Sequence, residues 1–147
     1  MFLKKQKGFT LIELLAVIVI LAVIAFIASP LIMGTITKAK KNSAVDSAYG
    51  YMKAVEQAIG EHQVDDPTGE FDVAGKTFTT KDGGATITTT SYPDLEITVN
   101  YKGSAPANGG TLTYDTNGRV TSGTLNIGGY TVKVTNDKAT ITTSPTA

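Results

Sequence analysis

Hydrophobic positions divide the chain into two halves with different patterns. From Leu14 to Met33 the sequence runs for 20 residues without a charge, and only Ser29 and Pro30 interrupt the apolar side chains. As a helix this run spans about 30 Å, the thickness of the hydrocarbon core of a bilayer. It is too long for the apolar region of an ordinary secretory signal peptide, and no Ala-x-Ala cleavage site closes it. The pattern predicts a helix that needs lipid or copies of itself around it.

Beyond Gly34 the apolar residues take the spacing of an amphipathic helix. They recur at intervals of three and four, and the stripe consists of Val45, Ala48, Met52, Val55, Ile59 and His62. Pro67 and Gly69 are expected to end the helix. The sequence therefore predicts about 81 Å of nearly continuous helix from Phe9 to His62. Its hydrophobic part is residues 9–34, and its amphipathic part is residues 35–63.

The C-terminal half alternates between apolar and polar residues, as half-buried strands do. The clearest alternating runs are 95–102, 130–135 and 139–142. Two-residue hairpin signals stand at Asn117-Gly118, Gly128-Gly129 and Asn136-Asp137. We expect a connecting loop at 64–84 and an antiparallel β-sheet head at 85–147. The predicted inner face consists of Leu112, Tyr114, Val120, Leu125, Ile127, Tyr130, Val132, Val134 and Ile141.

That inner face is thin for a domain without disulfides, so the amphipathic stripe is expected to supply the missing layer. A long helix packed on one face of an antiparallel sheet is an α+β architecture. The polar side of the strands is rich in threonine, since 21 of the 23 threonines follow Thr35. Threonine favours strands and leaves a hydrated exterior.

Composition excludes several classes of function. The chain has 147 residues, with 13 basic against 13 acidic side chains and no cysteine. A net charge of zero argues against electrostatic capture of nucleic acid as the main task, although it does not forbid nucleic-acid binding. The lack of cysteine excludes disulfides, thiol catalysis and cysteine-ligated metals.

Candidate chemical motifs are weak throughout the chain. Gly69 and Gly75-Lys76-Thr77 have the wrong spacing for a phosphate loop and lead into a strand. The acidic side chains between Asp65 and Asp72 lack calcium-loop spacing and are interpreted as a solvated turn. His62 has no second histidine to complete a zinc site. We expect no catalytic residue, no cofactor and no metal site.

Glu13 does not fit a plain membrane anchor. A carboxylate at membrane depth costs about 2.5–3.5 kcal/mol on insertion scales. Glu13 could lie at the interface among Lys4, Lys5 and Lys7, or it could await a cation from elsewhere. Because short N-terminal segments are rarely exported, residues 35–147 are expected outside the membrane.

Three lysines, Lys38, Lys40 and Lys41, flank the far end of the apolar run. They could contact anionic headgroups, at about 1 kcal/mol for each lysine. They could equally pair with acidic side chains of adjacent subunits, and the sequence leaves both open.

The segment Lys7-Gly8-Phe9-Thr10-Leu11-Ile12-Glu13-Leu14-Leu15 resembles the processing signature of type IV prepilins and pseudopilins. The resemblance implies a leader of residues 1–8, cut off after Gly8 by a prepilin peptidase that methylates Phe9. It implies that Glu13 of an incoming subunit pairs with the Phe9 amine of its neighbour. The mature chain then has 147 − 8 = 139 residues and a side-chain charge of 10 − 13 = −3.

The resemblance also assigns Pro30 and Gly34 as positions where the helix loosens when subunits pack into a fibre. Pro30 removes a backbone donor and clashes with the carbonyl of Phe26. The chain departs from the commonest family pattern in carrying Ala22 where many members have glycine. It also lacks the frequent C-terminal cysteine pair, which leaves any disulfide-bounded loop in doubt and suits a Gram-positive surface.

As a member of this family, the chain would be the major structural subunit of a type IV pilus, serving adhesion, motility or DNA uptake. The implied partners are copies of itself, the peptidase, a platform membrane protein, an assembly ATPase and minor pilins. It would reside as a single-pass protein in the cytoplasmic membrane, in contact with lipid, before joining an extracellular pilus. One alternative is a pseudopilin of a type II secretion or competence apparatus. Another is a membrane-tethered binding module that never polymerises.

Overall fold

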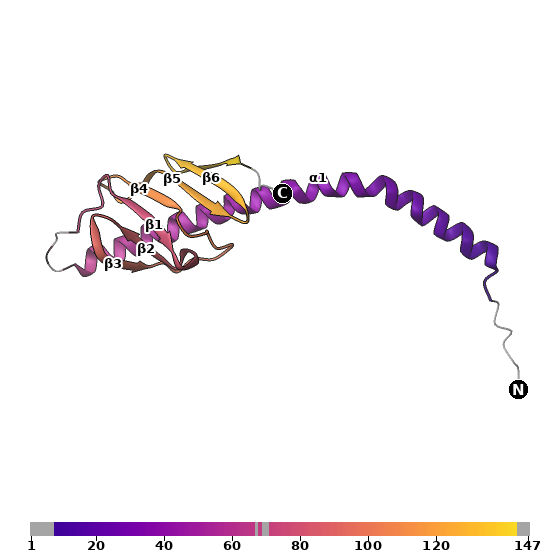
Figure 1. The fold of residues 1–147 in the computed structure, drawn as a ribbon, viewed down its shortest axis with the longest axis horizontal. Helices are drawn as coiled ribbons and strands as arrows, with labels where there is room; N and C mark the ends of the chain where they lie inside the picture. Colours follow the sequence, from indigo (N-terminus) through magenta and orange to yellow (C-terminus); the bar gives the residue numbers. More distant parts are fainter. Residues whose placement is uncertain (1–7, 67, 69–70, 144–147) are drawn as a thin grey trace, which may run out of the picture. The chain divides into compact units, whose positions relative to one another are not determined.

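A computed structural model describes residues 8–66, 68 and 71–143. It has one long helix followed by a seven-stranded antiparallel sheet, which confirms the predicted α+β architecture (Figure 1). The chain divides into two compact units, residues 1–39 and 40–147. The leader residues 1–7, the predicted turn residues Pro67, Gly69 and Glu70, and the end 144–147 lie outside the described residues.

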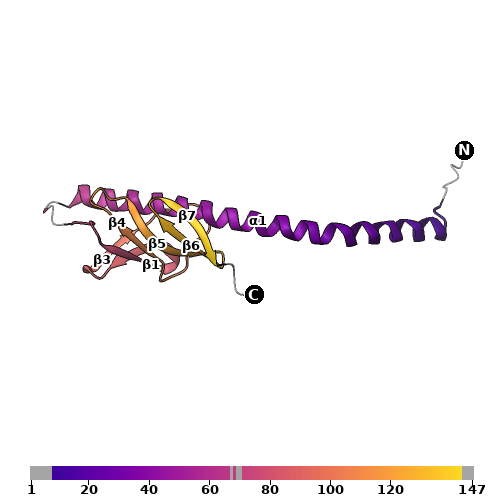
Figure 2. The same cartoon turned by 90° about the horizontal axis from the view of Figure 1, so that it is seen from above.

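Helix α1 runs from Leu11 to Asp65. In the second unit its apolar stripe packs on the sheet, and both views show residues 40–65 along one face of the strands (Figures 1 and 2). The predicted stripe positions are buried or half-buried. The buried residues of α1 are Ala44, Ala48, Tyr51, Met52, Val55, Ala58 and Ile59.

The sheet has the strand order β3-β2-β1-β4-β5-β6-β7, with every neighbouring pair antiparallel. A single 3₁₀ turn, η1, covers Asp82–Gly84. The strands are β1 Thr77–Lys81, β2 Thr86–Thr89, β3 Tyr92–Thr98, β4 Thr111–Tyr114, β5 Val120–Ile127, β6 Tyr130–Thr135 and β7 Lys138–Thr143. The predicted inner-face residues are buried, with Ile141 half-buried at the end of β7.

The sheet begins earlier than the sequence predicted, because β1 lies inside the expected connecting loop of residues 64–84. Its inward positions are Phe78 and Thr80, and an inward threonine hides the apolar alternation. The Thr80 hydroxyl is satisfied within the fold, since it donates to the Ala107 carbonyl at 2.8 Å and accepts from the Gly110 N–H at 2.8 Å. A buried polar group with both partners costs little, so threonine is tolerated there.

The alternating run at 95–102 also differs from the expectation, because β3 starts at Tyr92 and ends at Thr98. Its partner β2 begins at Thr86, so the ladder stops at the pair of Thr86 with Thr98. The alternation nevertheless continues, with Val99 buried and its N–H donating to the Ala85 carbonyl.

Two of the three predicted hairpin turns are confirmed. Gly128-Gly129 joins β5 to β6, and Asn136-Asp137 joins β6 to β7, with positive φ at all four residues. That is the backbone a two-residue hairpin of this twist requires. The third signal, Asn117-Gly118, also lies between two paired strands, β4 and β5, but the connection covers residues 115–119 and is longer than the predicted two residues. The Asp115 carboxylate accepts the N–H groups of Asn117 and Arg119 there, and this widens the connection.

Side-chain hydrogen bonds fasten α1 to the sheet along the second unit. The Tyr51 hydroxyl donates to the Gly84 carbonyl at 3.0 Å, and the Ala139 N–H donates to the Tyr49 hydroxyl at 3.0 Å. Glu56 accepts from the Val120 N–H at 3.3 Å. Burial raises the pKa of Tyr51, so its hydroxyl stays a donor at physiological pH. These bonds fix the register of the helix on the sheet and so define one rigid head.

Candidate functional site

The predicted cleavage position lies just before the helix begins. Gly8, Phe9 and Thr10 are outside α1 and exposed, with Phe9 89% accessible. A Cβ added at Gly8 would meet nothing within 4 Å, so packing within this chain gives no reason for a glycine there. The Gly8–Phe9 peptide bond is therefore non-helical and open to a protease. A requirement for glycine at this position would come from outside the chain.

Thr10 and Glu13 together form a capping box at the start of α1. The Thr10 N–H and hydroxyl both donate to Glu13 Oε2, at 2.8 and 2.7 Å, and the Glu13 N–H donates to Thr10 Oγ1 at 3.3 Å. The reciprocal bonds satisfy orphan donors at the helix start. The capping box was not predicted, although its signature is in the sequence: a threonine followed three residues later by glutamate before an apolar run.

The capping bonds give Glu13 hydrogen-bond donors but no opposite charge. Both ion pairs found among the described residues lie in the head, Lys53 with Glu56 and Lys81 with Glu96. Glu13 therefore carries its negative charge at the start of a long apolar helix.

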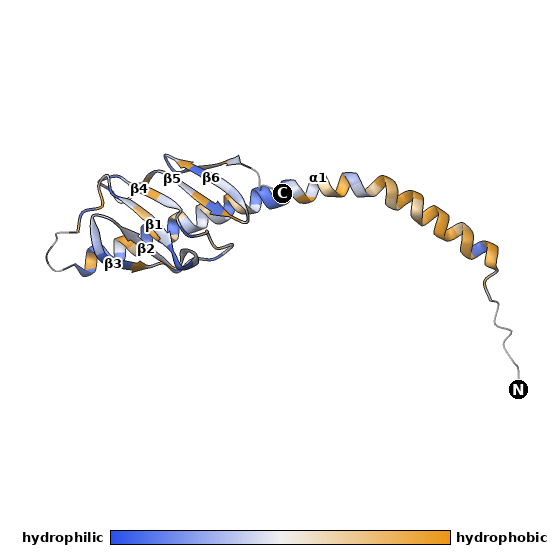
Figure 3. Ribbon diagram, viewed as in Figure 1, coloured by the Kyte–Doolittle hydropathy of each residue, from blue (hydrophilic) through white to orange (hydrophobic). Residues whose placement is uncertain are grey.

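The N-terminal part of α1 exposes almost all of its apolar surface. Large hydrophobic side chains from Phe9 to Ile36 are between 48% and 89% accessible. Hydropathy colouring shows the same concentration of apolar residues (Figure 3). The helix is long and apolar enough to cross a membrane. Apolar patches of this extent mark surfaces that are covered by lipid or by another protein.

Pro30 and Gly34 both lie inside α1, which continues through them. The Thr35 and Thr37 hydroxyls donate back to the carbonyls of Leu31 and Met33, at 3.2 and 3.0 Å. Such back-bonding is common in membrane helices and favours bending. The loosening of the helix at Pro30 and Gly34 on assembly stays a prediction.

The weaker candidates of the sequence take ordinary structural positions. Thr77 of the phosphate-loop-like segment opens strand β1. Asp66 accepts from the N–H groups of Thr68 and Phe71, as expected of a turn. His62 packs edge-on against Phe71, with ring centroids 4.8 Å apart. Among residues 8–66, 68 and 71–143 no group of three metal-ligating side chains gathers.

The described residues define a class of protein: a chain with an exposed apolar N-terminal helix and a packed α+β head. Residues 3–29 match the family described as the prokaryotic N-terminal methylation motif. The chain is also similar to the type II secretion system core protein G of Escherichia coli (strain K12), at 41% identity over 61 residues. No solved structure matches the chain significantly.

That similarity covers 42% of this chain, and the chain spans about two fifths, 39%, of the relative's length. Both similarities support the predicted resemblance to type IV pilins and pseudopilins. The matched residues 3–29 include the capping box and the predicted cleavage position.

Proposed function

We propose that the chain is a structural subunit of a helical filament, and that it acts by polymerising rather than by catalysis. One observation carries the proposal: helix α1 is packed against a sheet over residues 44–59 but exposes apolar side chains from Leu11 to Ile36. A surface of that size needs a partner. Copies of the same helix supply one, and a contact that does not close into a ring propagates into a filament.

Processing prepares the subunit for assembly. A prepilin peptidase cleaves the Gly8–Phe9 bond and methylates the new amine, as the family motif suggests. The cation then lies four residues before Glu13, which is about one helical turn. Because Glu13 is already fixed by the capping box, its carboxylate is oriented at the helix start. Glu13 of an incoming subunit then pairs with the Phe9 amine of its neighbour.

The partners of the subunit follow from this cycle. Before assembly the chain is a single-pass membrane protein in contact with lipid. A platform membrane protein, an assembly ATPase and minor pilins drive its transfer into the fibre. Mature copies then form the extracellular shaft of a type IV pilus. Because the head has no cysteine, we place this pilus on a Gram-positive cell.

The second candidate is a pseudopilin that builds short fibres within a secretion or competence apparatus. The similarity to a core protein of type II secretion favours this function specifically. The two candidates share the N-terminal processing and differ in fibre length and location.

Electron microscopy of cells with and without the gene separates the two candidates. A pilus subunit predicts long surface fibres that disappear on deletion and return on complementation. A pseudopilin predicts no change in surface fibres but a loss of protein export or of DNA uptake. A tethered module that never polymerises predicts neither change, and that result would contradict the proposal.

A further inference from the structure

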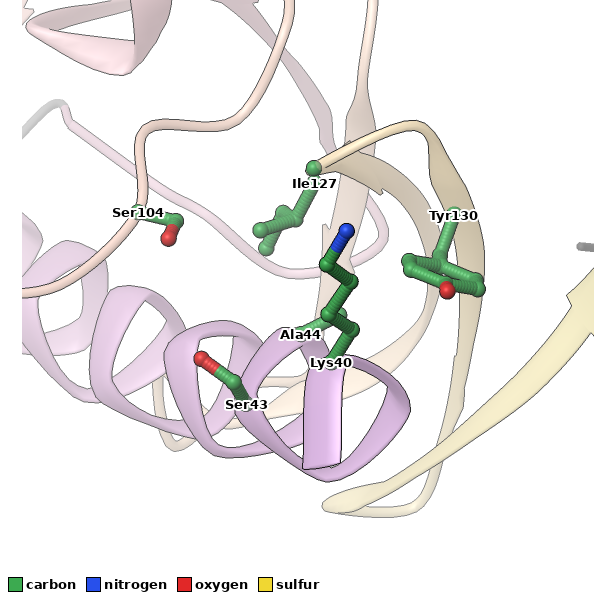
Figure 4. Close-up of a pocket in the computed structure, with 7 residues that line it drawn as sticks. Lys40, Ser43, Ala44, Ser104, Ile127 and Tyr130 are labelled. Atoms are coloured by element: carbon green, nitrogen blue, oxygen red, sulfur yellow. The ribbon is translucent and has the colours of Figure 1, made fainter. Parts of the chain in front are cut away.

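The end of the head where α1 enters carries a cationic pocket. Lys40 rises from α1 beside the β5–β6 turn, over a hollow of about 270 Å³ floored by Ala44, Ile127 and Tyr130 (Figure 4). The Lys40 ammonium group makes no hydrogen bond or ion pair with any of the described residues. An unpaired cation beside an apolar floor suits an acidic group that brings apolar contact with it.

The opposite end of the head carries a groove with the complementary character. Two adjoining hollows of about 240 and 390 Å³ share Tyr92 and Leu95. The Phe71 and Tyr92 rings lie 5.3 Å apart. Asp66 lines the first hollow, where its carboxylate accepts from the N–H groups of Thr68 and Phe71, and Asp94 lines the second. Aromatic faces beside carboxylates favour an ammonium group, through cation–π attraction and ion pairing.

The sign of the charge changes along the part of α1 that lies in the head and along the loop that follows it. Residues 40–53 carry three lysines and one aspartate, whereas residues 54–75 carry six acidic side chains and no lysine or arginine. Asp65 lies in the last turn of α1 with His62, and Glu61 directly precedes that turn. The helix dipole is negative at this end and favours cations. This unfavourable placement is relieved when a cation arrives from another molecule.

We propose that the Lys40 end of one copy docks onto the Phe71–Tyr92 groove of a second copy, with the Lys40 ammonium group against Asp94 and Tyr92. The contact rests on the proposed filament function and specifies how heads join within it. Lys40 and His62 are 22 residues apart on α1, or about 33 Å. The two surfaces therefore lie at opposite ends of one head and can meet only between copies.

A second copy is the occupant that the charges favour. Each head presents both halves of the contact, so the contact is heterologous and repeats along a fibre. Helices already joined through their apolar surfaces would hold the heads at high effective concentration, so a modest contact suffices. Heads joined in this way are offset along the fibre by about the length of the head, roughly 33 Å.

Disulfide crosslinking tests the contact directly, because the chain has no cysteine of its own. Isolated fibres of the double variant Lys40→Cys/Asp94→Cys should give a ladder of linked multimers on non-reducing gels. The control pair Lys40→Cys/Thr124→Cys places the second thiol on an exposed position of β5 and should give no ladder. Normal fibres without a ladder from the first pair, or an equal ladder from both pairs, would overturn the proposal.

Charge reversal provides a second test. Lys40→Glu should lower the yield of fibres at least fivefold, and adding Asp94→Lys should restore most of it. Lys133→Glu, on an exposed position of β6, should leave the yield within twofold of the parent chain. Failure of Asp94→Lys to rescue Lys40→Glu, or persistent crosslinking of position 40 to lipid in finished fibres, would contradict the contact. If the unmodified chain forms no fibres at all, the filament function itself fails.

Discussion

The two halves of α1 place their large apolar side chains in opposite environments. In the head, Met52 and Val55 are 1% and 0% accessible because the sheet covers them. In the N-terminal half, Phe26 and Leu31 are 85% and 77% accessible. Burying a side chain of this size contributes about 1.5–3 kcal/mol. The half of α1 in the head has gained this free energy on folding. The N-terminal half gains it only when another surface covers it.

This difference separates folding from assembly within one helix. Substitutions in the head should alter its stability, whereas substitutions in the N-terminal half should alter fibre formation and leave the head unchanged.

Replacing Glu13 by glutamine should have the largest effect. Glutamine can still accept the Thr10 hydrogen bonds of the capping box, so the variant removes the charge and keeps the cap. We expect fibre yield to fall at least tenfold, on the order of the loss of one buried ion-pair partner. The fibre yield is measured as the amount of subunit in sheared fibres relative to the amount that stays in the membrane.

The matched control is Asp46→Asn, which removes an exposed carboxylate from the head part of α1. It should leave the ratio of fibre to membrane subunit near that of the parent chain. Normal fibres from the Glu13→Gln variant would show that the charge has no role in assembly.

The same leucine truncation should behave differently in the two regions. Leu125 is fully buried, so Leu125→Ala should lower the unfolding free energy of the head by about 2–5 kcal/mol. Leu31 is exposed, and Leu31→Ala should change the unfolding free energy of the head by less than about 0.5 kcal/mol. Thermal unfolding of the full chain in detergent, followed by tyrosine circular dichroism, compares them. Equal losses of stability would contradict the division.

Two glycines of the head should respond in opposite directions to alanine. A Cβ at Gly123 would press into the Thr111 carbonyl and lie 2.8 Å from a Leu112 methyl, so Gly123→Ala should cost about 1–3 kcal/mol. A Cβ at Gly60 would meet nothing within 4 Å, and alanine favours a helix. Gly60→Ala should therefore stabilise by about 0.5–1 kcal/mol. Chemical denaturation of both variants gives the sign of each change in unfolding free energy. A Gly123→Ala head as stable as the parent would refute the close approach of β4 to Gly123 of β5.

The smallest effect is expected at the β4–β5 loop. The backbone N–H of Arg119 holds the pKa of Asp115 below its ordinary value of 3.8. A lowered folded-state pKa contributes stability above pH 3.8 that is lost as the pH falls through the folded-state value. Asp115→Asn should therefore unfold slightly earlier than the parent at pH 7 and match it at the acid end. A difference that grows on acidification would contradict this sign.

Much of the fold could be predicted because its signals are local. The stripe from Val45 to His62 follows helical spacing, and the turns at 128–129 and 136–137 have the residues that hairpins need. Strand β1 was not predicted, because Thr80 occupies an inward position. Its hydroxyl is hydrogen-bonded to the backbone of Ala107 and Gly110, which are far away in sequence. Such a partner cannot be read from alternation, so a polar core position looks like a loop.

Processing at Gly8–Phe9 stays a prediction, and its signal is contiguous in the sequence, within the matched residues 3–29. Gly8, Phe9 and Glu13 stand within six residues. The spacing of Thr10 and Glu13 also predicts the capping box, but only the charge of Glu13 was interpreted from the sequence. The Phe71–Tyr92 groove could not be predicted, because it joins the end of α1 to the start of β3. Only the folded chain brings those residues together.

Mass spectrometry of the N-terminus of subunits isolated from fibres tests the central claim most directly. The account predicts a chain of 139 residues that begins with N-methylated Phe9 and retains Glu13 unmodified. Fibres built from subunits that still begin at Met1 would contradict it, because no new amine would then lie beside Glu13.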